Sequence, residues 1–180
     1  AIAETLQSLG AKTTLVSGPT SLAEPNVEQV IKVNSADEML EACESSLPAD
    51  IAVCAAAVAD YKIANKEIAK IKKDGSRQNI ILEENPDILE RLSKRNHLRP
   101  KLVVGFAAET SNLERNSDEK LSKKGCDWVL GNNVSENSIF NQDTNKIYFT
   151  SKLYSENWEL MTKKEVAKKL CQKISLHLNN

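Results

Sequence analysis

Apolar residues fall along this chain in two spacings. In some segments they follow one another without a break, as in strands, and in others they recur every three or four positions, as on one face of a helix. Uninterrupted or β-branched runs predict strands at 13–17, 28–33, 50–59, 79–82, 101–108 and 127–132. The third and fifth runs are the most apolar, which is typical of strands buried on both faces of a parallel sheet.

Capping residues mark where helices begin and end between these strands. The first residues form an amphipathic pattern that ends at Gly10, a residue favoured directly after helices. Ser35, followed three residues later by Glu38, predicts a capping box at the start of a second helix. Asn85 and Pro86 predict the N-cap and the first helical position of a third.

The C-terminal part continues the alternation and adds a hairpin. A helix is expected over 113–124, stopped by Gly125, and a last helix from Thr162. The segments 146–150 and 158–161 flank a turn and are expected to pair as an antiparallel edge hairpin. The whole pattern predicts one α/β domain of Rossmann-like type, with a mainly parallel sheet flanked by helices and this hairpin near the C-terminus.

Polar residues follow three of the predicted strands. Asp60 ends the run 50–59, Glu109 and Thr110 follow the run 101–108, and Asn132 and Asn133 close the next strand. Taken singly, each is as readily explained by an Asx turn or a helix cap. In parallel sheets, however, ligands bind beyond the carboxyl ends of the strands, so these ends are where a site is expected.

Two groups of lysines suggest an anionic ligand. Lys70, Lys72 and Lys73 stand in a polar loop, and Lys120 and Lys124 are four residues apart, on one face of their helix. Solvated surfaces would explain both groups, since lysines near a helix C-terminus also favour the dipole. The sharper interpretation is a mobile basic flap and a lysine pair that bind phosphates, a task that suits compact cations on flexible stems.

Composition and charge exclude several classes. A net charge of −1 and an aromatic share of 4% argue against nucleic-acid binding. No apolar run approaches the roughly 18 residues that span a bilayer, so no membrane association is expected. Neither His97 nor His177 lies near a metal-ligand pattern. The four cysteines are far apart and form no CxxC pair, which predicts reduced cysteines in a cytoplasmic protein: Cys43, Cys54, Cys126 and Cys171.

Eight segments taken in order resemble phosphopantothenate–cysteine ligase. They are "LVSGPTSL", "AAVADY", "KIKK", "NPDIL", "VGFAAET", the lysine pair, "GCDWVLGNNVS" and "FNQDTNKIYF", and they cover essentially the whole chain. In bacteria this family is often the C-terminal half of a bifunctional coenzyme A biosynthesis protein. The resemblance implies that CTP activates the carboxylate of 4′-phosphopantothenate as an acyl-cytidylate, releasing pyrophosphate, and that the amine of cysteine then displaces CMP.

The resemblance also implies which residues bind CTP. Asp60 is expected to contact the nucleoside, Lys70 to act as the catalytic flap residue on the phosphates and reacting carboxyl, and the pair Lys120 and Lys124 to hold the triphosphate. The full expected set is Ala56, Ala57, Asp60, Lys70, Pro86, Asp87, Ile88, Leu89, Phe106, Lys120 and Lys124.

Further expectations follow from the same resemblance. Mg²⁺ would offset the repulsion between the reacting anions, and the protein would be a cytoplasmic homodimer, with a fused N-terminal phosphopantothenoylcysteine decarboxylase in many bacteria. The family has a glycine-containing first strand and an asparagine-containing substrate loop before the point where Ala1 aligns. Residues 1–180 are therefore expected to form a single CTP-binding ligase domain that is inactive without these segments.

One departure and two alternatives complete the sequence-based picture. Asn133 stands where many relatives have an acid, so a charge-dependent role there is in doubt. An NAD(P)-dependent oxidoreductase on a similar sheet is one alternative, against which the missing GxGxxG motif counts. A non-catalytic nucleotide-binding module is the other, since paired lysines and a flap would suffice for binding.

Overall fold

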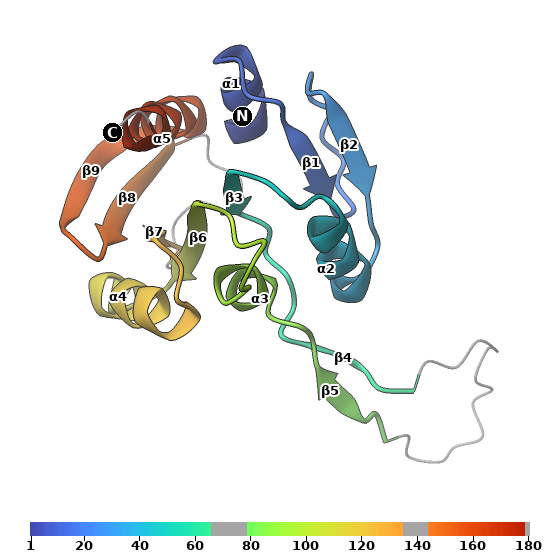
Figure 1. Ribbon diagram of the computed structural model, residues 1–180. Coiled ribbons are helices and arrows are strands. Elements are labelled where there is room, and N and C mark those ends of the chain that lie inside the picture. Colours follow the sequence, from blue (N-terminus) through green and yellow to red (C-terminus); the bar gives the residue numbers. More distant parts are fainter. Residues whose placement is uncertain (66–78, 135–143, 179–180) are drawn as a thin grey trace.

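The computed structural model describes residues 1–65, 79–134 and 144–178. Its central sheet has five strands in the order β3-β6-β7-β8-β9 (Figure 1). The first three strands are parallel, and β8 and β9 form an antiparallel hairpin on the edge beside β7, as the sequence predicts. The strand bounds are β3 Ile51–Cys54, β6 Leu102–Glu109, β7 Trp128–Asn133, β8 Thr144–Ser151 and β9 Ser155–Thr162.

Two further pairs of strands lie outside this sheet. β1 (Thr14–Ser17) and β2 (Gln29–Lys32) form a small parallel sheet of their own. β4 (Tyr61–Ile63) and β5 (Leu82–Glu84) pair as an antiparallel ribbon. Figure 1 shows this ribbon projecting away from the body of the domain.

Five helices in the described part of the chain cover the sheets. On one face of the central sheet, α1 (Ile2–Ser8) and α5 (Lys163–Leu178) pack on a core that includes Leu102, Val104 and Trp158. On the other face, α3 (Ile88–Ser93) and α4 (Leu113–Lys124) cover a second core. α2 (Ala36–Ser45) packs beside β1, β2 and α3. No helix among the described residues is long and apolar enough to cross a membrane.

Two glycines allow α3 and α4 to lie close against the sheet. A Cβ atom on Gly105 would come within 2.6 Å of Leu89 Cδ2 from α3. A Cβ atom on Gly131 would clash with the side chains of Ser117 and Leu113 from α4. Strands β6 and β7 therefore each need a residue without a side chain where a helix crosses them.

Most predicted helix ends are confirmed. Ser35 Oγ accepts a hydrogen bond from the Glu38 N–H at 3.2 Å, and Thr162 Oγ1 accepts one from the Glu165 N–H at the same distance. α4 spans the predicted residues 113–124 and ends at Gly125, whose φ of 70° is in the left-handed region that glycine tolerates.

The start of α3 differs from the prediction. Its N-cap is Asp87 rather than Asn85, and Pro86 lies before the helix. The Asp87 carboxylate accepts a hydrogen bond from the Glu90 N–H at 2.8 Å. Both Asn and Asp favour this position. Ile88, the first helical residue, is buried at 8% exposed.

Two predicted strands are also wrong in extent. The run 50–59 forms a strand only at Ile51–Cys54, because pairing with β6 ends at Gly105, and Ala55–Ala57 are exposed. The strand expected at 79–82 instead covers Leu82–Glu84, where β4 supplies its partner. The segment 61–63, expected in a loop, is that partner.

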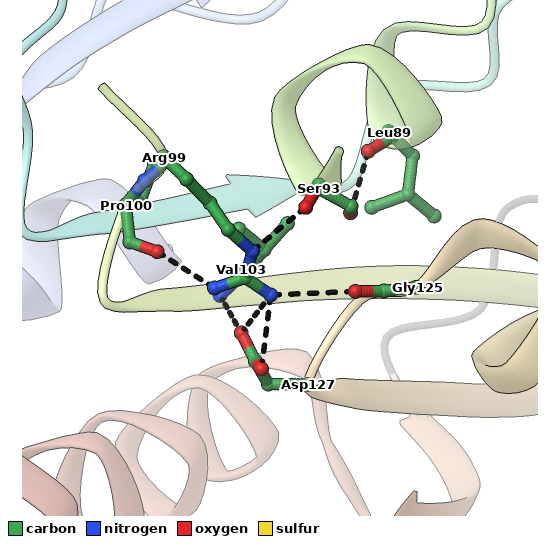
Figure 2. A network of polar contacts seen from close by, with 7 residues as sticks. All are labelled: Leu89, Ser93, Arg99, Pro100, Val103, Gly125 and Asp127. Atoms are coloured by element: carbon green, nitrogen blue, oxygen red, sulfur yellow. Dashed lines mark hydrogen bonds and ion pairs between the residues drawn. The ribbon is translucent and has the colours of Figure 1, made fainter. Parts of the chain in front are cut away.

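An arginine joins the C-terminal ends of α3 and α4, as Figure 2 shows. Arg99 donates hydrogen bonds to the carbonyl oxygens of Ser93 at 2.7 Å and Gly125 at 3.3 Å, and its Nη2 lies 2.9 Å from Asp127 Oδ2. The same carboxylate accepts a hydrogen bond from the Val103 N–H at 2.7 Å. One guanidinium thus links two helices to the starts of β6 and β7.

Candidate functional site

The lysine pair on α4 lies against the start of α3. Lys124 forms an ion pair with Asp87, the N-cap of α3, and its Nζ lies 3.9 Å from Glu90 Oε2. Lys120 Nζ donates a hydrogen bond to the carbonyl oxygen of Phe106 in β6 at 2.6 Å. The two lysines predicted on sequence to share a helix face therefore point into the same region, between α3, α4 and β6.

Electrostatic effects show which acids share this region. The hydrogen bond from Lys124 to Asp87 raises the pKa of Lys124, and the nearby charges of Asp87, Glu90 and Asp60 raise it further. Burial alone would raise the pKa of Asp87, but hydrogen bonds from Lys124 and the Glu90 N–H, with the charge of Lys120, hold it below its usual value. Of the predicted set, Asp87, Lys120 and Lys124 therefore interact, and the charge of Asp60 acts on Lys124.

Asp60 reaches this cluster from a different place than predicted. It lies six residues beyond the end of β3 at Cys54 and directly before β4, rather than at the carboxyl end of a strand. Its side chain is exposed. Its backbone carbonyl accepts a hydrogen bond from the Asn85 N–H at 2.8 Å, which continues the pairing of β4 with β5 by one position.

The remaining predicted residues are exposed or half-buried, or have side chains that pack in the core. Ala56 and Ala57 are exposed and Pro86 is half-buried. The side chains of Ile88 and Leu89 are core residues, each 8% exposed, so their part in a site would be played by the backbone. The ring of Phe106 packs against the core under α1 and α5, so only its carbonyl oxygen meets Lys120.

Some predicted positions cannot be placed or lie elsewhere. Lys70, Lys72 and Lys73 fall outside the described residues. Asn133 closes β7, where its register partner is Glu109 of β6. The Glu109 carboxylate accepts a hydrogen bond from Asn116 Nδ2 at 2.7 Å. The ends of β6 and β7 thus lie side by side, as predicted, and their polar side chains interact within the protein.

Neither a reactive cysteine nor a metal cluster made by protein side chains alone is found among the described residues. All four cysteines are free, and burial raises the pKa of Cys54, at the end of β3, to about 12. A thiol with such a pKa is not a nucleophile near neutral pH. Within residues 1–65, 79–134 and 144–178, no three His, Cys, Asp or Glu side chains converge in a way that could hold a metal ion.

Two residues near the cluster were missed on sequence. Asn85 connects the segment before β4 to the segment before α3, and Arg99 joins the C-terminal ends of α3 and α4. The spacing of Asp87 and Glu90 could have identified the true N-cap, because a capping residue is often followed three positions later by Glu. Asn85 would then not have been predicted as the N-cap of this helix.

Comparison with known proteins finds relatives of this chain among bifunctional proteins of coenzyme A biosynthesis. The chain is 38% identical over 175 residues to the coenzyme A biosynthesis bifunctional protein CoaBC of Haemophilus influenzae, covering 97% of this chain and 44% of the relative. It is 35% identical over 179 residues to the CoaBC protein of Bacillus subtilis, with the same coverage. A cysteine/cysteine sulfinic acid decarboxylase from an unknown prokaryotic organism is 36% identical, and 49% of it is covered.

The chain therefore spans about half the length of these curated relatives. Among solved structures, the C-terminal domain of a CoaBC protein superposes with a TM-score of 0.79 at 32% identity, over 99% of this chain and 80% of that one. A DNA/pantothenate metabolism flavoprotein from Streptococcus pneumoniae has the same fold, with a TM-score of 0.78 at 21% identity, over 98% of this chain and 86% of that one.

The family comparison agrees with both results over nearly the whole chain. Residues 1–177 match the family described as the DNA/pantothenate metabolism flavoprotein C-terminal domain. The match includes the segment around Asp60, the start of α3 and the lysine pair of α4. The chain belongs to this family.

Proposed function

We propose that this chain acts in coenzyme A biosynthesis, as a CTP-dependent ligase that joins 4′-phosphopantothenate to cysteine. One observation carries the proposal: Lys124 pairs with Asp87 and senses the charge of Asp60, and Lys120 contacts β6, in a chain 38% identical to a CoaBC protein over 97% of its length. Two adjacent ammonium groups suit a polyphosphate, and an exposed carboxylate nearby suits the polar edge of a nucleoside.

The proposed reaction has two steps. In the first, a carboxylate oxygen of 4′-phosphopantothenate attacks the α-phosphorus of CTP, and pyrophosphate leaves. In the second, the amine of cysteine attacks the acyl carbon, CMP leaves with the bonding electrons, and the nitrogen loses a proton. The first step brings anions together, so fixed cations that stabilise the developing charge would accelerate it. Lys120 and Lys124 would supply that charge on the leaving phosphates.

The lysines are already engaged in the free protein. Lys124 pairs with Asp87, and Lys120 donates to a backbone carbonyl. A bound triphosphate would therefore exchange the Lys124–Asp87 ion pair for contacts to phosphate oxygens. Because 20% of the Lys124 side chain and 37% of the Asp87 side chain remain exposed, water can replace the lost partner and the exchange is not prohibitive.

Mg²⁺ fits this site as an ion that arrives with the nucleotide. Mg²⁺ in nucleotide-dependent enzymes commonly binds one or two carboxylates together with substrate phosphates, rather than a complete protein cage. The described residues offer no three-ligand cluster, so the phosphates and water would supply most of the ligands of such an ion. The ion would neutralise charge on the phosphates, and Asp60 keeps its proposed role at the nucleoside.

A homodimer is also proposed, and the β4–β5 ribbon supports it. Tyr61, Ile63 and Leu82 are 56%, 46% and 57% exposed, and Ile80 and Ile81 beside them are 68% and 64% exposed. Large apolar side chains gathered on a projecting ribbon are typical of an interface. Lys70, which lies between the two strands in sequence but outside the described residues, is proposed as the catalytic flap residue.

Ligand-dependent stabilisation of the full-length protein tests the proposal. Thermal unfolding would be followed with CTP, ATP or NAD, each with Mg²⁺. A ligand that binds the native state raises its stability by an amount that grows with the ratio of ligand concentration to Kd. CTP is expected to raise the melting temperature, and CMP release is expected to require both 4′-phosphopantothenate and cysteine. Stabilisation by NAD and not by CTP would overturn the proposal in favour of an oxidoreductase.

A further inference from the structure

Asn85 connects two segments of the candidate site that are far apart in the sequence. Its side-chain Nδ2 donates a hydrogen bond to the Ala59 carbonyl oxygen at 2.9 Å, and its backbone N–H donates to the Asp60 carbonyl oxygen at 2.8 Å. Asn85 follows β5 and precedes the Asp87 cap of α3. It therefore fastens the segment that carries Asp60 to the segment that carries Asp87.

The two hydrogen bonds have different origins. The backbone bond to Asp60 continues the β4–β5 pairing, in which Tyr61 lies opposite Glu84. Any residue other than proline could make it. The side-chain bond to Ala59 lies outside that ladder and needs a donor of the length and direction of an asparagine amide. Only this second bond depends on the identity of residue 85.

An apolar contact also supports the Asp60 segment, on the side towards β3. Val58 is half-buried and packs against the core beside α2 and α3. Ala59 and Asp60, which follow it, are exposed. An ion pair from Lys62 to Asp37 of α2, at 2.6 Å, restrains the ribbon beyond Tyr61. Between Val58 and Tyr61, the hydrogen bonds from Asn85 therefore fix the position of the backbone.

We infer that Asn85 is a positioning residue for the nucleoside end of the site: its side chain holds Ala59 and Asp60 in place relative to Asp87 and Lys124. The inference rests on the proposed function, in which Asp60 contacts the nucleoside and the lysines contact phosphates. Asn85 itself touches neither group of the ligand in this scheme. Its loss should therefore weaken recognition of the nucleoside and leave the phosphate contacts intact.

The test compares two ligands that share phosphates and differ in the nucleoside. Dissociation constants of Mg²⁺–CTP and Mg²⁺–tripolyphosphate would be measured by calorimetry for the full-length wild type, Asn85→Ala and Asn85→Ser. One hydrogen bond corresponds to roughly a five- to tenfold change in affinity. Asn85→Ala is expected to lose about that factor for CTP and stay within about twofold for tripolyphosphate. Asn85→Ser, which keeps a shorter donor, should recover part of the CTP affinity.

Matched controls separate positioning from folding. Asn157 is an exposed strand asparagine whose Nδ2 donates to Glu114 Oε1 at 3.4 Å, away from the lysine cluster, and Asn157→Ala should bind both ligands like the wild type. Asn85→Asp places an acceptor against the Ala59 carbonyl and should bind CTP more weakly than Asn85→Ala. Thermal unfolding of each variant checks that the fold is retained.

The outcomes distinguish this inference from the function on which it rests. Unchanged CTP affinity in Asn85→Ala, or an equal loss for both ligands, would overturn the positioning role while leaving the ligase proposal standing. A wild type that binds neither ligand would instead contradict the proposed function. If Asn85→Ala proves unstable, the CTP affinities of the other three proteins decide the question. The positioning role requires that affinity falls from the wild type to Asn85→Ser and falls further to Asn85→Asp, and any other order would overturn it.

Discussion

The ammonium of Lys124 rests against the carboxylate of Asp87, joining the last turn of α4 to the N-cap of α3. A cation proposed to bind phosphate is therefore held in place by an internal anion. The Asp87 carboxylate occupies part of the space in which a phosphate oxygen would otherwise interact with Lys124. Competition between the internal carboxylate and the ligand should be visible in binding measurements.

Substitutions on the two sides of this ion pair should have opposite effects on anion binding. Asp87→Asn keeps an N-cap for α3, since Asn caps as well as Asp, but frees Lys124 and removes a negative charge. We expect it to bind Mg²⁺–tripolyphosphate about threefold more tightly, because Lys124 no longer has to break an ion pair in order to bind phosphate. A partly exposed pair of this kind contributes about 0.6 kcal/mol. Lys124→Met should lower the affinity for the same ligand about tenfold. Calorimetry on both variants checks this, and equal losses in both would contradict the competition.

The ion pair should stabilise the fold only within a pH window. The pKa of Asp87 lies below its usual value, so its contribution is present above about pH 4 and is lost as the pH falls through the lowered pKa. The pKa of Lys124 is raised, so its contribution is lost only as the pH rises above about 10.5. A double-mutant cycle with Asp87→Asn and Lys124→Met should give an interaction of about 0.5–1 kcal/mol at pH 7.

Urea unfolding over a series of pH values from about 7 downwards measures this interaction. As the pH falls through the lowered pKa of Asp87, the carboxylate becomes protonated and the interaction energy should fall towards zero. An interaction that stays constant over the whole series would mean that the two side chains stabilise the fold through packing rather than charge.

Gly131 should tolerate no side chain while α4 keeps its present position. Gly131→Ala places a methyl group against Ser117 and Leu113 and should cost about 1–3 kcal/mol of unfolding free energy. The Ser117 hydroxyl is fully buried and has no hydrogen-bond partner among the described residues. Ser117→Ala should therefore be neutral or stabilising, because it removes an unsatisfied polar group. Chemical denaturation of both variants measures these changes.

The double variant provides the control for that prediction. Ser117→Ala removes the atom that lies nearest to the new methyl group, the hydroxyl oxygen, so it should restore part of the stability lost in Gly131→Ala. Strict additivity of the two effects would show that the helix shifts freely and that close packing at this point is not required.

Arg99 should contribute to stability well beyond an ordinary surface arginine. Arg99→Ala removes the cationic partner of the Asp127 carboxylate, which keeps only its hydrogen bond from the Val103 N–H, and removes donors from the carbonyl oxygens of Ser93 and Gly125. Since the side chains of Arg99 and Asp127 are each 26% exposed, we expect a loss of about 2–3 kcal/mol. Arg115→Ala, whose guanidinium pairs with Glu119 on the exposed face of α4, is the control and should cost under about 1 kcal/mol.

Lys70→Gln is expected to affect chemistry and not folding. In the full-length protein the substitution should leave the melting temperature unchanged and slow amide formation, since it removes the cation proposed to reach the phosphates and the reacting carboxyl. Single-turnover formation of the amide measures the effect. Wild-type rates in this variant would remove Lys70 from the proposed mechanism.

Sequence patterns identified the large elements because each had local signals. α4 matches its predicted bounds, with Gly125 as its stop, and β6 and β7 follow long apolar runs. The three-residue strands β4 and β5 carried no such signal, because they depend on pairing between positions 61 and 84, which are far apart in the chain. The alanines at 55–57 misled the prediction, since they are apolar but small enough to be exposed at little cost.

In the candidate site, too, the features set by local sequence were predicted and those set by tertiary contacts were not. The common face of Lys120 and Lys124 follows from helical spacing, and the structure places both beside β6. Their partners, the Asp87 carboxylate and the Phe106 carbonyl, belong to other elements, so only tertiary packing could reveal them. Asn85 was assigned a local capping role because its true acceptor, Ala59, is 26 residues away.

The geometry of the ribbon base gives the site an unusual mechanical property. The chain passes Asp60 on its way into β4 and passes Asp87 soon after leaving β5. A change in the angle of the projecting ribbon would therefore move Asp60 relative to Lys124 while the central sheet keeps its place. A molecule that binds the exposed apolar side chains Tyr61, Ile63 and Leu82 of the ribbon would change the spacing of charges at its base without contacting the lysines.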